Sequence, residues 1–271
     1  MINVTAVTHI VALSLAILFM HACTPVEVEQ MLPQQYRPDQ AYHPVLGFDA
    51  TAYLKNQPMQ VRYQQLDASG QPIMTETEGD AQPEPATVSE TWQWKRTAQG
   101  RWQLIRERAD QRREYYERSD GNWLLVGVED LEHQSTTRYE PGLIYLPDDL
   151  EPGQTVESSA KIHLTRPKRF GSGMVEETGQ ITMATTFLAR QKVRTPVGVY
   201  DCDLIEVTGE VDLPAAKVQS REQLYLHAEA GLVSFMMSED VQAVGLLRWT
   251  KHYRILLDDK IDWQTPRISQ P

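Results

Sequence analysis

Residues 90–106 read ETWQWKRTAQGRWQLIR, and this stretch decides the fold. Trp92 and Trp94 stand two positions apart, which places both side chains on one face of an extended strand. The four residues TAQG then supply a reversal, and Trp102 and Leu104 repeat the same spacing on the return. The pattern predicts an antiparallel β-hairpin with one apolar face.

Strand patterns of the same kind continue along the chain. A second hairpin is predicted from 114–118 and 123–129, because the Asp120-Gly121 pair between them tolerates the positive φ angles of a tight turn. Further strands are expected at 59–66, 155–165, 179–190, 191–194, 199–211, 218–227, 231–237 and 241–257. These regular short strands predict an all-β fold: a single, mostly antiparallel, meandering sheet that curls into an open or half barrel.

The N-terminus has a different composition from the rest. An apolar run at 10–20 leads to Met20-His21-Ala22-Cys23, after which the sequence turns abruptly polar and rich in Pro and Gln. The run is shorter than the roughly 20 residues that a membrane-spanning helix needs. A short apolar run ending at a small residue is typical of a cleaved export signal. An anchor helix, or a cleaved signal in which Cys23 is incidental, is the alternative.

Met20-His21-Ala22-Cys23 resembles the lipobox of bacterial lipoproteins, whose pattern is Leu, a small residue, Ala or Gly, then the lipidated Cys. The resemblance implies that Cys23 is acylated and that the protein is held at a membrane by several acyl chains, since one chain binds only marginally. Thr24 follows the Cys where an inner-membrane retention signal would carry Asp. The implied location is the outer membrane, facing the periplasm.

The chain is therefore expected to have four parts. A lipoprotein signal peptide at 1–22 is followed by a flexible tether at 23–40, rich in Pro and Gln. An antiparallel β domain spans 41–258 and carries an acidic loop near 78–88, and a C-terminal tail spans 259–271. Within the β domain, the stretches VRTPVGVYDC (193–202) and QLYLHAEAGLV (223–233) resemble uncharacterised β-rich envelope lipoprotein families. That resemblance implies a fold and no known activity.

Charge and cysteine content limit the partners. The formal net charge of −11 argues against a nucleic-acid partner, because phosphate binding needs clustered Lys and Arg. The basic stretch 101–118 alternates with acidic residues and is interpreted as a solvated hairpin face. If Cys23 is acylated, Cys202 has no partner within the chain, and its spacing from Tyr200 and Leu204 predicts a buried structural thiol.

Recognisable catalytic chemistry is not found in the sequence. It holds no Gly-x-Ser-x-Gly elbow, phosphate-binding loop, dinucleotide fingerprint or His-Glu-x-x-His pair, and no two of its later His residues are closely spaced. We therefore predict no catalytic residue, no metal site and no cofactor, and a protein that is not an enzyme. The open alternative is an envelope hydrolase whose site is assembled from distant positions.

Four tryptophans are the candidate ligand-binding residues: Trp92, Trp94, Trp102 and Trp123. They fit either a packed core or a groove for an apolar or sugar ligand, and half-buried strand faces favour the core. The function predicted from the sequence is a non-enzymatic binding or envelope-assembly module. Its expected partners are the membrane, through lipid on Cys23, and an envelope protein or an apolar ligand. A carrier of an apolar or lipid ligand on the concave sheet face is the alternative.

Overall fold

The computed structural model describes residues 59–67, 69–75, 83–168, 172–228, 230–243 and 247–258. The predicted signal peptide, tether and C-terminal tail lie outside these ranges, as do residues 41–58 and part of the acidic loop. Twelve strands are described: β1 (Met59–Gln65), β2 (Thr87–Arg96), β3 (Trp102–Glu107), β4 (Arg112–Ser119), β5 (Asn122–Asp130), β6 (Ser135–Leu146), β7 (Thr155–Pro167), β8 (Met174–Thr195), β9 (Gly198–Leu213), β10 (Ala216–His227), β11 (Gly231–Ala243) and β12 (Leu247–Leu257).

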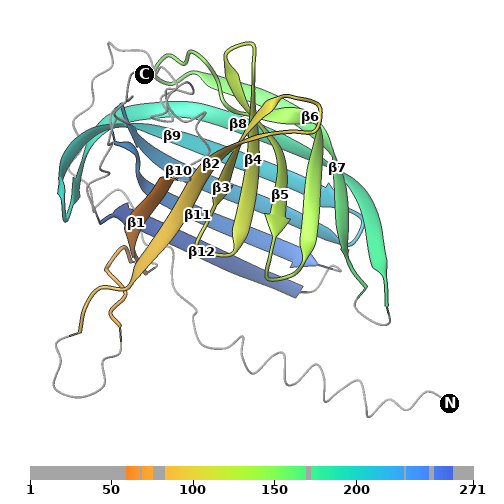
Figure 1. Ribbon diagram of the computed structural model, residues 1–271, viewed down its shortest axis with the longest axis horizontal. Coiled ribbons are helices and arrows are strands. Elements are labelled where there is room, and N and C mark those ends of the chain that lie inside the picture. The colour runs from red at the N-terminus through yellow and green to blue at the C-terminus, as the bar shows by residue number, and fades with distance from the viewer. Residues whose placement is uncertain are drawn as a thin grey trace, which may run out of the picture.

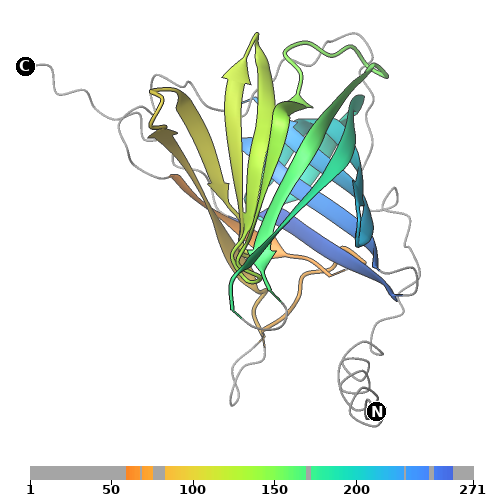
Figure 2. The same ribbon diagram turned by 90° about the vertical axis from the view of Figure 1, so that its right-hand side faces the viewer.

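The strands form one antiparallel sheet that closes into a barrel (Figure 1). Each strand pairs with its neighbours in the sequence, and β1 closes the ring by pairing with β12 from Tyr63↔Leu257 to Gln65↔Ile255. In Figure 2 the yellow and green strands form one wall and the blue strands the opposite wall. The prediction of an all-β fold with one curled antiparallel sheet is confirmed, and the curl continues to full closure.

Both predicted hairpins are present. In the first, Trp94 lies opposite Leu104, so the alternating residues of β2 and β3 share the inner face of the sheet. In the second, Asp120 and Gly121 connect β4 to β5 with φ angles of 50° and 82°. Positive φ at both central residues is the turn geometry that an Asp-Gly pair favours. The Asp-Gly turn therefore starts the pairing of β4 with β5, and a bulge between Tyr115 and Tyr116 shifts the register farther along.

The strand boundaries differ from the prediction on the other side of the barrel. Residues 179–190 and 191–194 belong to one long strand, β8, instead of two. A shift of register between Phe187 and Ala189 lets β8 bend and continue along β9, as a β-bulge does. The predicted strand 241–257 is divided between β11 and β12.

An apolar core fills one half of the barrel. Its most buried members, with no exposed surface, include Leu143, Phe187, Ile205 and Phe235. Most of these side chains lie toward the end of the barrel where β4 turns into β5 and β10 turns into β11. Among the described residues, no helix is long and apolar enough to cross a membrane. The other half of the barrel has a different, polar filling.

Candidate ligand site inside the barrel

Charged residues are buried inside the barrel. Arg106 is 1% exposed and Arg108 is 4% exposed, so the prediction of a solvated face is wrong for both. The reason is the alternation of the strand: Arg106 follows Leu104 by two positions and must point to the same inner face. Arg113 instead points to the outer face, where it pairs with Glu107 at 2.7 Å.

Two buried carboxylates compensate these arginines. The Arg106 Nε donates to Glu90 at 3.0 Å, and its Nη1 donates to Glu114 at 3.3 Å. Arg108 Nη1 donates to the other oxygen of Glu114 at 2.7 Å, and the Tyr116 hydroxyl donates to Glu114 at 2.7 Å. Glu114 therefore receives hydrogen bonds from three side chains, and this saturates most of its capacity as an acceptor.

The pKa values of the two carboxyls move in opposite directions. Burial acts to raise the pKa of Glu114, but the positive charges of Arg108 and Arg106 outweigh it and hold the pKa well below its usual value. At Glu90, burial is the larger effect and raises the pKa despite the charge of Arg106. The network thus contains one firmly ionised carboxylate and one whose charge is costly.

Aromatic rings cover the faces of both guanidinium groups. The ring of Phe235 contacts both groups, with its centroid 4.7 Å from Arg106 Cζ and 4.8 Å from Arg108 Cζ. Arg106 also stacks on Trp92 at 5.0 Å, and Arg108 on Tyr253 at 4.7 Å. Cation–π contacts of this kind are strongest where water is excluded. These contacts place the two buried guanidinium groups directly against aromatic residues of the apolar core.

A cavity of about 230 Å³ lies beside these groups, toward the end of the barrel where β5 turns into β6 and β9 turns into β10. One wall is apolar and comes mainly from β7 to β10: Ile162, Leu164, Ile181, Met183, Val211, Leu213 and Val218. The remaining lining is rich in polar groups, among them Arg112, Glu114, Tyr116, Tyr139, Tyr145, Glu222 and Glu239. The cavity is therefore amphipathic, which suits a ligand with an apolar body and a polar group.

Two contacts fix the polar side of the cavity. The Tyr145 hydroxyl donates to Glu222 at 2.6 Å. Arg112 binds Glu239 through both terminal nitrogens, at 2.7 and 2.6 Å, and so ties β4 to β11 across the interior. Burial, followed by the negative charge of Glu114, raises the pKa of Glu222. Among the carboxyl groups that line the cavity, Glu222 is therefore the one whose ionised form the protein stabilises least.

Sequence reasoning did not identify this cavity. No family model, curated protein or solved structure matches the chain. The sequence nevertheless contains a pattern that indicates buried acidic residues. Glu114 precedes Tyr116 by two positions and Glu222 precedes Leu224 by two, so each acid shares a strand face with an apolar or aromatic residue. An acidic residue at the inward spacing of a strand indicates a polar interior, since such a group is buried only with partners.

The four candidate tryptophans do not line this cavity. Trp92, Trp94 and Trp123 are 3–6% exposed and belong to the core, where the rings of Trp94 and Trp123 lie 5.5 Å apart. Trp102 has the same inward spacing but lies at the end of β3 and is 37% exposed. Cys23 lies outside the described residues. Cys202 is fully buried, as predicted, and burial raises the pKa of its thiol.

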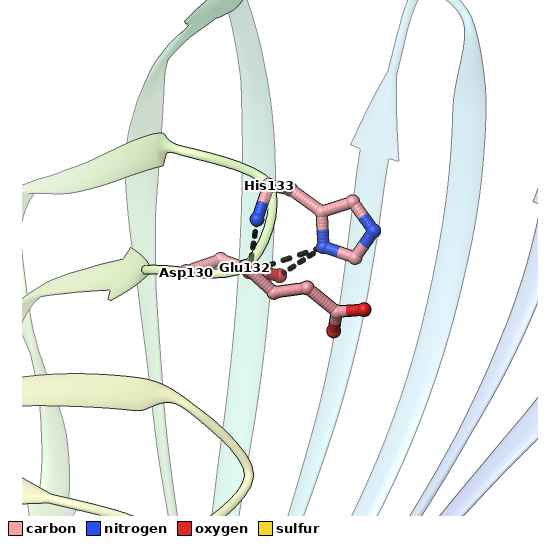
Figure 3. Close-up of side chains that lie close together, drawn as sticks. All are labelled: Asp130, Glu132 and His133. Atoms are coloured by element: carbon pink, nitrogen blue, oxygen red, sulfur yellow. Dashed lines mark hydrogen bonds and ion pairs between the residues drawn. The ribbon is translucent and has the colours of Figure 1, made fainter.

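A group of possible metal ligands lies on the turn between β5 and β6 (Figure 3). The ligand atoms of Asp130, Glu132 and His133 are within 4.8 Å of one another, and the last two side chains are exposed. The carboxylate of Asp130 accepts hydrogen bonds from the backbone N–H of His133 at 2.9 Å and contacts its ring Nδ1 at 3.0 Å. These contacts are those of a side chain that closes a turn, and they account for the grouping.

Proposed function

We propose that this protein binds a small amphipathic ligand inside its barrel without chemically altering it, as a periplasmic lipoprotein attached to the outer membrane through Cys23. The observation that carries the binding proposal is the cavity with an apolar wall facing a polar one. Its volume of about 230 Å³ lies below the range of pockets that take drug-sized molecules, so the ligand is small.

Binding is favoured over hydrolysis by the state of the polar groups. Glu114 is engaged by Arg106, Arg108 and Tyr116, so it is poorly placed to attack a substrate or to activate water. Binding a ligand is also favoured over docking a partner strand, because β1 and β12, the first and last strands that the structure describes, pair with each other.

The outer face of the barrel supports attachment through an N-terminal lipid. Ion pairs cross neighbouring strands there: Arg113 lies 2.9 Å from Glu129, and Arg221 lies 2.6 Å from Glu206. Charged pairs of this kind belong to a surface in contact with water. An anchor outside the barrel then supplies the affinity for the membrane.

Filling the cavity should abolish binding. The purified protein is titrated with octylamine, octanol and octanoate by calorimetry, and at least one should bind with a stoichiometry of one. Met183→Trp replaces a thioether side chain of the apolar wall with a bulkier indole ring that occupies the cavity. The variant should therefore give no heat of binding. Thr182→Trp is the matched control, because Thr182 is exposed on the outer face of the same strand. Unchanged binding by a folded Met183→Trp protein would contradict the cavity as the site.

Replacing Cys23 with Ser should abolish lipidation. The thiolate that accepts the lipid is then absent, so metabolic labelling with a clickable fatty acid should tag the wild type and not the variant. Cys202→Ser is the control and should label normally, since Cys202 is buried in the barrel. Equal labelling of the Cys23→Ser protein would rule out this attachment.

A further inference from the structure

Four carboxyl groups line the cavity, and three of them contact a nitrogen-bearing side chain that can carry positive charge. These contacts are Glu114 with Arg106 and Arg108, Glu239 with Arg112, and Asp130 with His133. Glu222 differs. Within the described part of the chain, its carboxylate has a tyrosine hydroxyl as its hydrogen-bond donor and no ion pair. The lining therefore contains one carboxylate that the protein does not neutralise directly.

The neighbouring residues of β10 do not supply the missing cation. Arg221 points to the outer face, where its Nε donates to Glu206 at 2.6 Å. Gln223 also reaches Glu206, at 3.3 Å. Burying an ionised carboxylate without a cation is costly, and a ligand that brings the cation removes this cost. The alternation of β10 thus leaves Glu222 facing the cavity, where the ammonium group of a ligand would stabilise its ionised form.

Aromatic rings surround the same part of the cavity. Tyr116, Tyr139 and Tyr145 all line it, and the rings of Tyr116 and Tyr145 lie 5.2 Å apart at a tilt of 51°. A carboxylate beside several aromatic rings is the combination that recognises organic ammonium groups, through charge pairing and cation–π attraction. An anionic head group would instead meet Glu222, the lining carboxylate without an ion pair among the described residues, and would be disfavoured there.

We infer that the ligand is a small alkyl amine whose ammonium group pairs with Glu222 while its hydrocarbon part packs on the wall formed by β7 to β10. This inference rests on the proposed binding function and adds the chemical class of the ligand. The apolar wall provides burial for the chain, and Glu222 provides selectivity for the head group.

The test compares ligands that differ only in the head group. Octylammonium, octanol and octanoate are titrated into the purified protein near neutral pH. Octylammonium should bind about tenfold more tightly than octanol, the effect expected of one charged hydrogen bond, and octanoate should bind more weakly than both. Glu222→Gln should lower the affinity for octylammonium about tenfold and leave that for octanol unchanged. Glu206→Gln, on the outer face, is the matched control and should have no effect.

The possible results separate the two proposals. Equal binding of the three ligands, or a preference for octanoate, would overturn the cationic class and leave the binding function standing. Ammonium selectivity that persists in Glu222→Gln would overturn the role of Glu222. If none of the three ligands binds, both the inference and the proposed function fail. The comparison of head groups in the wild type decides the class even if Glu222→Gln does not fold.

Discussion

Arg106→Met should lower the free energy of unfolding by about 3–5 kcal/mol, the loss measured when one partner of a buried ion pair is removed. The side chain is 1% exposed and is the hydrogen-bond donor that joins Glu90 to Glu114. Methionine keeps most of the volume and the contact with the ring of Phe235, so the loss reports the charge more than the packing. Urea unfolding, followed by circular dichroism, measures the free energy of unfolding of the variant and of the wild type.

Arg113→Met is the matched control. Arg113 lies on the adjacent strand but faces outward, where it pairs with Glu107 and Glu129. Because such partly exposed pairs contribute about 0–1 kcal/mol, this variant should be nearly as stable as the wild type. Losses of similar size in the two variants would show that the buried network of Arg106 has no special role in stability.

The decrease in the free energy of unfolding caused by Arg106→Met should also depend on pH. Burial already raises the pKa of Glu90, and removing Arg106 takes away the charge that opposes this rise. A carboxyl with a higher pKa in the folded protein contributes stability at low pH and loses it as the pH rises through the folded pKa. The difference between variant and wild type should therefore be smaller at about pH 5 than at about pH 7.

Strand positions and hairpin turns could be predicted from the sequence because they depend on near neighbours. The spacing of Trp92 and Trp94 gave the inner face of β2, and Asp120-Gly121 gave the turn between β4 and β5. The length of β8 was missed because the bulge at Phe187 depends on how β8 pairs with β9. Bulges are set by pairing between strands, and a single sequence does not give that register.

The polar interior could not be predicted for a related reason. The charges at Arg106 and Arg108 suggested a solvated surface, because buried charges are rare without partners. Arg106 pairs with Glu90 of the neighbouring strand, 16 positions away, and both arginines pair with Glu114. At the cavity, Tyr145 and Glu222 are 77 positions apart. Closure of the barrel brings Tyr145 of β6 and Glu222 of β10 together across the interior, and the sequence predicted a curled sheet without its closure.

Trp94→Ala should lower the free energy of unfolding by about 3–5 kcal/mol, as large-to-small changes of aromatic core residues do. Trp94 is 6% exposed, and its ring lies 5.5 Å from that of Trp123 in the apolar half of the barrel. Truncation to Ala removes most of the buried ring and leaves a cavity that rigid strands on both sides cannot close.

Trp102→Ala tests whether burial is the cause. Trp102 belongs to the same hairpin and has the same inward spacing, but it is 37% exposed at the end of β3. Trp102→Ala should therefore lower the free energy of unfolding clearly less than Trp94→Ala does, because the substitution removes less buried apolar surface. Thermal melts of both variants decide the matter. If Trp94→Ala melted like the wild type and lost only a bound amphiphile, Trp94 would belong to a ligand groove, and the packed half of the barrel would be the binding surface instead of the cavity at Glu222.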